Sequence, residues 1–460
     1  MSITLGIIYL ISTITFVIGL KLLGHPETAK RGNSIAATGM GLAIIGTIFL
    51  HNLEVPAFIY ILIIAAILIG SLIGWMIAIK VEMTKMPELV SLFNGFGGAS
   101  AALIGIVEFG NGQADTTQVT TIIAAIIIGS ITFSGSMIAW AKLNGSMGKD
   151  IRLLKYNLIN NLLLIALIVF GFFIVNGNIG GNMIIYVLLL FSLIYGILFV
   201  IPIGGADMPV VISLLNSLTG IAAAITGILY NNMVMMVGGI LVGSAGLILT
   251  FAMCKAMNRS LSNVIFGAFG GDSVEATGGG KTGGHIKKTN PSDVAVLMNY
   301  ANKVVIVPGY GLAVAQAQHV IHELEELLAK KGVEVSYAIH PVAGRMPGHM
   351  NVLLAESNVS YDKLIDMDDI NPQFKNTDVV LVVGANDVVN PAAHNDPSSP
   401  IYGMPILDVE DAKSIIINKR SMNPGYAGIQ NELFFNQKTS MLFGDAKETL
   451  TKLVQELKNM

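Results

Sequence analysis

Long apolar stretches separated by short polar loops occupy the first 259 residues of the chain. A helix that crosses the hydrocarbon core of a bilayer needs about 20 mostly apolar residues. Nine segments meet this requirement, at Ile3–Leu23, Ile35–His51, Ala57–Ile79, Glu88–Phe109, Val119–Ala141, Tyr156–Asn176, Met183–Ile201, Asp207–Tyr230 and Met233–Met257. The first lacks a basic start and a small-residue cleavage site, so it is predicted to be a transmembrane helix rather than a signal peptide.

After Gly270 the pattern changes to short apolar, β-branched runs that alternate with amphipathic segments. Helices are predicted over Leu312–Lys331 and Asp445–Leu457. Strands are predicted at Lys303–Val307, Val333–Ile339, Val379–Gly384, Ile406–Val409, Ser414–Ile417 and Met441–Phe443. Alternating strands and helices are typical of a parallel, doubly wound sheet. The fold class is therefore a multi-span α-helical membrane domain of about nine helices followed by an α/β Rossmann-like domain.

The chain is predicted to consist of a transmembrane domain (1–259), a linker (260–300) and a Rossmann-like domain (301–460). The linker contains Gly270-Gly271, Gly278-Gly279-Gly280 and Gly283-Gly284 with few apolar residues. Such a composition is typical of a flexible tether.

Composition agrees with a membrane protein, because 53% of the residues are hydrophobic and only 12% are charged, with a mean hydropathy of +0.67. Soluble domains carry roughly 25% charged residues. The net charge of −3 gives no sign of a nucleic-acid partner. The single Cys254 excludes an intramolecular disulfide and an all-cysteine metal site, and no metal site is expected.

Positive charges are confined to alternate loops of the membrane half. Lys30 and Arg31 lie in the first loop, Lys80 and Lys85 in the third, and the residues from Lys142 to Lys155 around the fifth, while Lys255 lies at the end of the last span and Arg259 follows it. The positive-inside rule then places the N-terminus outside and the soluble domain in the cytoplasm.

No charged residue or histidine lies at mid-membrane depth in any predicted span, although Asp207 begins the eighth at its cytoplasmic end. Most of the neutral polar residues in the spans are expected to form hydrogen bonds between helices. Asn94 and Asn216 differ because glycines beside them leave room for water. These two asparagines are candidates for lining a polar path through the membrane.

A glycine-rich turn, Pro308-Gly309-Tyr310-Gly311, joins the first predicted strand to the first predicted helix. In that context a G-x-G motif indicates a dinucleotide site, although Val314 stands where the third glycine would be. His340 follows the second strand, where an NAD site would have an acidic residue for the ribose. The absence of an acidic side chain at this position leaves room for a 2′-phosphate on the ribose and favours NADP.

Lys419-Arg420-Ser421 follows a buried apolar strand and forms a compact anion site, because arginine can hold a phosphate through two parallel N–H bonds. Taken alone, these three residues are equally compatible with a solvated strand end. Three other polar groups, at His340–Arg345, Gly384–Asp387 and Gly444–Ala446, also follow strands. Ligands bind at the carboxyl edge of such sheets, so the four groups together predict a binding site there.

Motifs in both halves resemble the beta subunit of the proton-translocating NAD(P) transhydrogenases, over essentially the whole chain. They are Met86–Val90, Gly204–Pro209, Lys255–Ser260, Pro308–Gly311, His340–Pro347, Gly384–Asp387, Asn390–Ala393, Gly403–Pro405, Lys419–Ser421, Gly425–Gly428 and Leu442–Lys447. The resemblance implies an NADP(H)-binding domain carried on a membrane proton channel. It also implies a partner alpha subunit that carries NAD(H), a dimer of alpha–beta units, and a place among the lipids of the bacterial cytoplasmic (inner) membrane.

The same resemblance implies which residues bind NADP(H): Gly309, Tyr310, Gly311, Val342, Ala343, Gly344, Arg345, Met346, Pro347, Gly384, Ala385, Asn386, Asp387, Val388, Gly403, Met404, Lys419, Arg420, Ser421, Met422, Asn423, Pro424, Gly425, Tyr426, Asp445 and Ala446. Within this set, Lys419, Arg420 and Ser421 would hold the 2′-phosphate, and Gly425-Tyr426 would belong to a lid. Hydride transfer needs two aligned nicotinamide rings rather than an acid or a base, so no side chain is expected to act as a chemical catalyst.

Coupling to proton passage is expected to involve Asn94, Asp207, Asn216 and Asp387. Many members of the family carry a histidine at the position of Asn94, so either the alpha side supplies the titrating proton carrier, which is the expectation here, or proton pumping is impaired. If burial and cofactor contact raise the pKa of Asp387, its protonation could bias open and closed states of the site.

Two other functions fit parts of the pattern. A nucleotide-gated transporter or channel would use the Rossmann-like domain only as a sensor, and would bind NADP(H) without turnover. A membrane reductase that passes electrons to quinone would usually need a flavin, haem or metal site, and none is evident in the sequence.

Overall fold

The computed structural model of the chain describes residues 3–24, 26–50, 56–111, 115–147, 156–177, 182–203, 207–258, 260–262, 286–346, 348–425 and 427–460. It divides into two compact units, Met1–Ile203 with Val211–Thr250, and Gly204–Val210 with Phe251–Met460.

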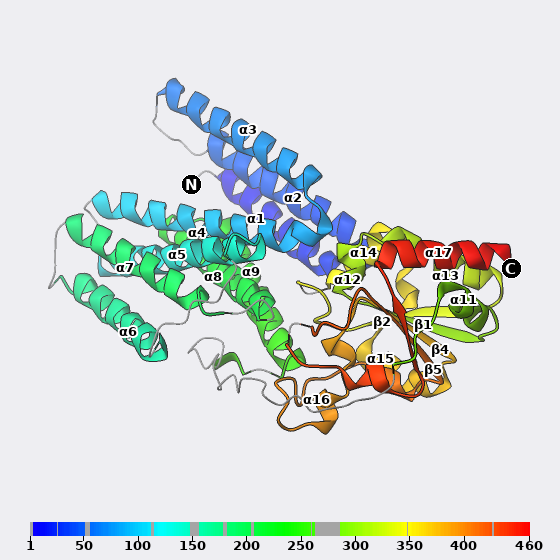
Figure 1. Cartoon of the computed structure of the whole chain (residues 1–460). Coiled ribbons are helices and arrows are strands. Elements are labelled where there is room, and N and C mark those ends of the chain that lie inside the picture. Colours follow the sequence, from blue (N-terminus) through cyan, green and yellow to red (C-terminus); the bar gives the residue numbers. More distant parts are fainter. Residues whose placement is uncertain are drawn as a thin grey trace. The chain divides into compact units, whose positions relative to one another are not determined.

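The first unit is a set of long apolar helices (Figure 1): α1 Ile3–Leu23, α2 Pro26–Leu50, α3 Ala57–Lys80, α4 Met86–Gly110, α5 Thr116–Leu143, α6 Tyr156–Val175, α7 Asn182–Val200, α8 Met208–Leu229 and α9 Met233–Ala256. In the described part of the chain, nine helices are long and apolar enough to cross a membrane, which confirms the predicted spans. The second begins at Pro26 rather than Ile35, because the helix continues through the polar residues that precede the apolar segment. The orientation in the membrane stays a prediction.

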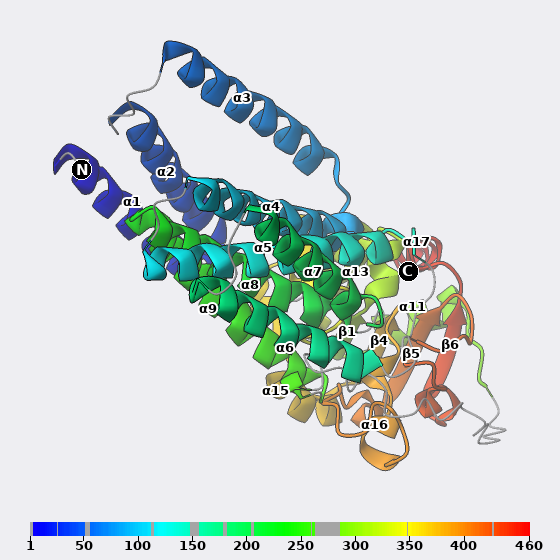
Figure 2. The ribbon, with the colours of Figure 1, turned by 90° about the vertical axis from the view of Figure 1, so that its left-hand side faces the viewer.

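Glycines bring the backbones of neighbouring helices into direct contact. A Cβ atom added to Gly98 of α4 would lie 2.6 Å from the carbonyl oxygen of Gly129 in α5, and one added to Gly220 of α8 would lie 2.4 Å from the amide nitrogen of Gly243 in α9. Figures 1 and 2 show α4 and α5 running side by side. Small residues at such crossings are the usual way in which transmembrane helices pack closely.

The second unit contains a six-stranded sheet in the order β3-β2-β1-β4-β5-β6. The strands are β1 Lys303–Pro308, β2 Glu334–Ile339, β3 Leu364–Asp366, β4 Val379–Val383, β5 Ser414–Lys419 and β6 Thr439–Phe443, and all neighbouring pairs are parallel. This confirms the predicted doubly wound α/β domain. The strand order reverses direction between β1 and β4, where ligands bind in such sheets.

Helices cover both faces of the sheet. On one face, α11 (Pro291–Asn299), α13 (Gln318–Lys330) and α17 (Ala446–Asn459) pack together (Figure 1). On the other, alternate strand residues such as Val305 and Val382 form a core with Phe374 and Phe434. The remaining short helices are α12 Tyr310–Val314, α14 His349–Glu356, α15 Met367–Ile370 and α16 Ala392–Asn395.

Three local predictions in this domain differ from the structure. The single helix predicted over Leu312–Lys331 is wrong, because Gln316 has a positive φ of 49° and separates α12 from α13. The strand predicted at Ile406–Val409 is also wrong, since residues 406–408 have no regular structure and a 3-10 turn (η5, Val409–Asp411) begins at Val409. The three-residue edge strand β3 was not predicted.

Part of the predicted linker is folded. Residues 263–285 lie outside the described residues, but Pro291–Asn299 forms α11, which packs on α17. The Asn290 side chain caps α11 by accepting the Asp293 N–H, and Lys288 forms a parallel bridge with Met441. The prediction that the linker extends to residue 300 is therefore wrong.

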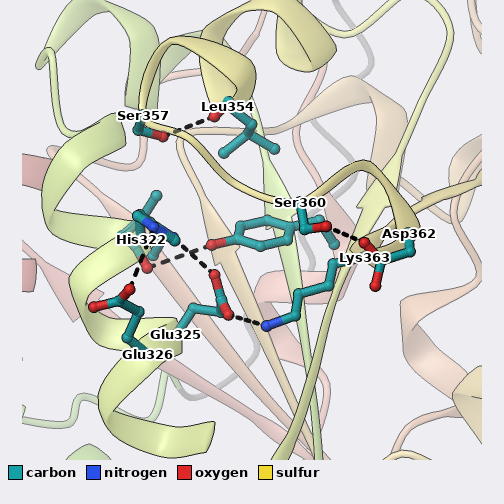
Figure 3. Close-up of polar contacts among 10 residues, drawn as sticks. His322, Glu325, Glu326, Leu354, Ser357, Ser360, Asp362 and Lys363 are labelled. Carbon is teal, nitrogen blue, oxygen red and sulfur yellow. Dashed lines mark hydrogen bonds and ion pairs between the residues drawn. The ribbon is translucent and has the colours of Figure 1, made fainter. Parts of the chain in front are cut away.

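A buried ionic cluster fastens α13 to the β3 edge of the sheet (Figure 3). The carboxylate of Glu325, which is 1% exposed, forms ion pairs with Lys363 and, at 2.9 Å, with Nδ1 of His322. A buried carboxylate is tolerated only when it is paired in this way. Lys363 directly precedes β3, so the cluster fixes the position of this short edge strand.

Candidate functional site

The carboxyl edge of the sheet is built from backbone packed on backbone. A Cβ added to Gly309 would lie 2.4 Å from the Ala385 nitrogen, and one added to Gly384 would lie 2.3 Å from the Gly311 Cα. Gly384 also has a φ of +66°, which favours glycine. The turn after β1 therefore touches the turn after β4 without any side chain between them, and the Gly311 N–H donates to Gly384 O at 2.9 Å.

Backbone hydrogen bonds extend this edge across four strands. The Gly309 N–H donates to Val383 O at 2.9 Å, the Gly384 N–H to Asn418 O at 3.1 Å, and the Gly444 N–H to Lys419 O at 3.1 Å. Each bond joins the turn after one strand to the end of the strand beside it in the sheet. The edge is consequently a rigid floor, which is what a binding site for a large planar ligand requires.

A pocket lies over this floor, and most of the predicted site residues line it. They are Gly309, Tyr310, Gly311, Val342, Ala343, Gly344, Met346, Gly384, Ala385, Asn386, Asp387, Val388, Met404, Lys419, Arg420, Ser421, Asn423, Pro424, Gly425, Asp445 and Ala446. Arg345, Gly403 and Met422 are not in the lining. Pro347 and Tyr426 lie outside the described residues.

Several lining residues lie outside the set that the resemblance assigns to NADP(H). Among them are Val314, Ala315, Pro400, Ile401, Asn418, Ala427 and Gly444. Gly444 belongs to the predicted strand-end group Gly444–Ala446, Ala427 lies within the motif Gly425–Gly428, and Asn418 directly precedes Lys419, so the sequence carried a signal for these three. Pro400 and Ile401 lie in a loop without such a signal.

Lys419 and Arg420 differ in whether their side chains are hydrogen-bonded within the protein. The Lys419 Nζ donates to Asn423 O at 2.7 Å and lies 4.8 Å from the centre of the Phe434 ring, and burial lowers the pKa of Lys419. Arg420 is exposed, and among the described residues no hydrogen bond or ion pair engages its guanidinium. Arg420 is therefore the cation of this site that is free to hold an anion.

The segment formed by residues 423–425 and 427–430, here called the strap, crosses the site beside Asp387. The Asp387 Oδ2 accepts the Ala427 N–H at 3.0 Å. A Cβ on Gly425 would lie 2.5 Å from the Asp387 Oδ1 and 2.7 Å from the Asn386 Nδ2. Only glycine therefore allows the strap to lie this close to the turn after β4.

Two buried histidines support the walls of the pocket in their neutral form. The His340 Nε2 lies 2.8 Å from Pro405 O, and its Nδ1 accepts the Val342 N–H at 3.2 Å. The His349 Nδ1 accepts the Arg345 N–H at 3.0 Å. Burial lowers the pKa of each to about 4, and the Arg345 charge contributes at His349. His340 is thus a brace between two loops rather than part of the lining.

Tyr310 and Arg345 are stacked at the end of β1. The Arg345 guanidinium carbon lies 4.5 Å from the centre of the Tyr310 ring, and the His349 ring meets the same ring edge-on at 6.1 Å. A cation over an aromatic face stabilises both side chains. Arg345 therefore acts behind the lining, by holding Tyr310, rather than in it.

Of the coupling candidates, Asn94 lies on α4 and Asn216 on α8, both in the first unit, while Asp207 belongs to the second. Asn94 is 8% exposed, and its backbone oxygen accepts the Thr219 hydroxyl of α8 at 3.3 Å. Asn216 is half-buried on α8, and Asp207 directly precedes that helix. In the described part of the chain the Nδ2 atom of Asn94 is buried without a hydrogen-bond partner, which fits a place beside a polar path.

The chemistry of the pocket fits a phosphorylated dinucleotide. Glycine turns let backbone amides approach phosphates closely, and α17 begins at Ala446 beside the pocket. The Asp445 carboxylate is used to cap α17, through the N–H groups of Lys447 and Glu448. The exposed guanidinium of Arg420 then supplies a cation for one further phosphate.

Comparison with known proteins identifies relatives over the whole length of the chain. The model of the family "NAD(P) transhydrogenase beta subunit" matches residues 5–456. The NAD(P) transhydrogenase subunit beta of Rhodospirillum rubrum is 47% identical over 461 residues, which is 98% of this chain and 98% of that protein. The corresponding protein of R. rubrum strain ATCC 11170 matches to the same extent.

Proposed function

Since this chain belongs to the NAD(P) transhydrogenase beta subunit family, we propose that its carboxyl-edge pocket binds NADP(H). Bound there, the nicotinamide exchanges a hydride with NAD(H) held by a partner alpha subunit. The observation that carries the proposal is the guanidinium of Arg420, an unengaged cation in a pocket floored by glycine turns. A 2′-phosphate is the group by which NADP(H) differs from NAD(H), and it needs such a cation.

The pocket residues share the binding between them. The glycine turns at Gly309–Gly311 and Gly384–Asp387 let the pyrophosphate lie close to the backbone because no side chain intervenes, and Arg420 with Ser421 holds the 2′-phosphate. The strap covers the ligand from the side of Asp387. Because alignment of two rings suffices for hydride transfer, the role of these side chains is to orient NADP(H) and keep water away.

We further propose that ligand exchange at this pocket is coupled to proton passage through the membrane unit. Asp387 holds the strap through the Ala427 N–H, so protonation of this carboxylate would weaken that bond and favour opening. Asn94, Asn216 and Asp207 would line the path, with the titrating group on the alpha side. The soluble domain would face the cytoplasm of a bacterium, on its inner membrane, in a dimer of alpha–beta units.

The phosphate assignment is tested by replacing Arg420 in the complex with its alpha partner. Arg420→Ala should weaken NADPH binding by roughly 10–150-fold, the 1.5–3 kcal/mol of a charge-assisted hydrogen bond, and leave the weak binding of NADH unchanged. Arg420→Lys should recover part of the loss because it keeps the charge.

Lys375→Ala removes an exposed cation that precedes β4, so it lies toward the opposite edge of the sheet, and it serves as the control. Equal losses for NADPH and NADH in Arg420→Ala would refute the assignment. Proton movement across the membrane of proteoliposomes during hydride transfer between NADP(H) and NAD(H) tests the coupling, and hydride transfer without any proton movement would contradict it.

A further inference from the structure

A buried asparagine next to the pocket, Asn431, fixes the orientation of a carboxamide inside it. Asn431 is 1% exposed and lies at the end of the strap. Its Oδ1 accepts the Leu433 N–H at 3.0 Å, and its Nδ2 donates to the backbone oxygen of Asn386 at 3.0 Å. Both partners are backbone groups with only one possible role, so the orientation of the Asn431 amide is determined.

The orientation of the Asn386 side chain follows from that of Asn431. The Asn431 Nδ2 also donates to the Asn386 Oδ1 at 3.3 Å. The oxygen of the Asn386 carboxamide therefore points at Asn431, and its NH₂ group points the other way. The backbone groups of Leu433 and Asn386 thus fix the Asn431 amide, and the Asn431 amide in turn fixes the side chain of Asn386 at the pocket.

The Asn386 NH₂ group is a donor without an acceptor among the residues that the structure describes. In the described part of the chain its Nδ2 is buried and lacks a hydrogen-bond partner. It lies close to Gly425 of the strap, where an added Cβ would be 2.7 Å away, and both Asn386 and Gly425 line the pocket. A buried amide donor left without an acceptor destabilises the protein. An acceptor supplied by a ligand removes that cost.

We propose that Asn431 is a positioning residue, which aims the Asn386 NH₂ group at an oxygen of the bound dinucleotide. The inference rests on the proposed NADP(H) site and assigns a role to a residue outside its lining. Asn431 does not touch the ligand; it prevents the Asn386 amide from flipping, which would present an oxygen to an oxygen.

The test replaces Asn431 by aspartate in the complete complex and measures NADPH affinity. The carboxylate of Asn431→Asp can still accept the Leu433 N–H, but it cannot donate to Asn386 and attracts the Asn386 NH₂ group toward itself. NADPH binding should weaken about tenfold, the value of one hydrogen bond of roughly 1.4 kcal/mol. Asn386→Asp removes the same donor while keeping an acceptor for Asn431, and it should cause a similar loss.

A matched control separates positioning from general destabilisation. The Asn371 carboxamide bridges backbone groups in the same manner, by donating to Ile406 O at 3.0 Å and accepting the Asp408 N–H at 3.2 Å, and none of the three lines the pocket. Asn371→Asp should lower the thermal stability of the complex but leave NADPH affinity unchanged. In an Asn386→Ala background, Asn431→Asp should cause no further loss of affinity, because the group it positions is gone.

The outcomes discriminate between the two proposals. The role of Asn431 is refuted if Asn431→Asp binds NADPH as tightly as the wild-type complex does. It is also refuted if Asn431→Asp lowers NADPH affinity by the same factor in the wild-type and the Asn386→Ala backgrounds. If Asn431→Asp does not assemble, full NADPH affinity in Asn386→Asp refutes it instead. Failure of the wild-type complex to prefer NADPH over NADH would instead overturn the proposed function itself.

Discussion

The neutral form of His340 provides a pH-dependent contribution to the stability of the α/β domain. Its Nδ1 accepts the Val342 N–H while its Nε2 hydrogen donates to Pro405 O. Protonation would place an N–H against the Val342 N–H, inside a site where His340 is only 2% exposed. Burial accordingly lowers the pKa of His340 from 6.5 to about 4.

The sign and size of the effect follow from linkage. A histidine whose pKa is lowered by folding takes up its proton more readily in the unfolded chain. Its stabilising contribution is therefore complete above pH 6.5 and is lost as the pH falls toward 4. From these two pKa values, acidification from pH 7 to pH 5 should cost about 2 kcal/mol at His340 alone.

Hydrogen exchange of the β2 amides in the intact complex measures this loss. In the wild type, the free energy of opening should fall by about 2 kcal/mol more between pH 7 and pH 5 than in His340→Gln, a difference of roughly 30-fold in protection. His349 is present in both proteins, so its contribution cancels. His319→Gln replaces an exposed histidine of α13 and should behave like the wild type. The same pH slope in folded wild type and His340→Gln would refute the argument.

Two further substitutions test the sheet domain. Glu325→Ala should lower the free energy of unfolding by roughly 1–3 kcal/mol, because it removes the buried carboxylate that pairs with Lys363 (Figure 3). Glu326→Ala removes an exposed carboxylate and should have little effect, and similar midpoints of denaturant unfolding in both variants would contradict this. Gly384→Ala should weaken NADPH binding more than about tenfold, equivalent to 1.4 kcal/mol, since its Cβ would push the turn at Gly311 away. The control is Gly332→Ala, because Gly332 has a similar φ of +86° but open space around it, and this variant should keep its NADPH affinity. Equal losses of affinity in Gly384→Ala and Gly332→Ala would show that backbone strain alone is responsible.

The features that the sequence predicts well depend on local patterns. Nine apolar segments and the strands β1, β2, β4, β5 and β6 are each readable from a single stretch of chain, and the polar groups after the strands meet at one edge because parallel strands all end there. The break between α12 and α13 was missed because it depends on the positive φ of Gln316, which no apolar period reveals. The edge strand β3 has three residues, too few for any periodicity.

The roles of individual side chains were harder to predict because they depend on contacts between distant residues. His340 is placed in the sequence where a ribose-binding acid would stand, yet its ring is used to join two loops through Val342 and Pro405. Lys419 and Arg420 are adjacent cations, but one is engaged by Asn423 and the other is not. The pair Asn386 and Asn431 is 45 residues apart, so no motif spacing could have joined them.

The polar groups of the pocket divide into those already bonded within the protein and those left for a ligand, and this division is the basis of the selectivity that we propose for NADP(H). The Asp445 carboxylate caps α17, and the Lys419 ammonium holds the strap. The Arg420 guanidinium and the Asn386 NH₂ group remain, and both can only donate in their present orientations. A ligand that satisfies them must present oxygens at two separate places, one of them anionic. NADP(H) meets this condition with its 2′-phosphate and a second oxygen, whereas NAD(H) leaves the arginine without an anion.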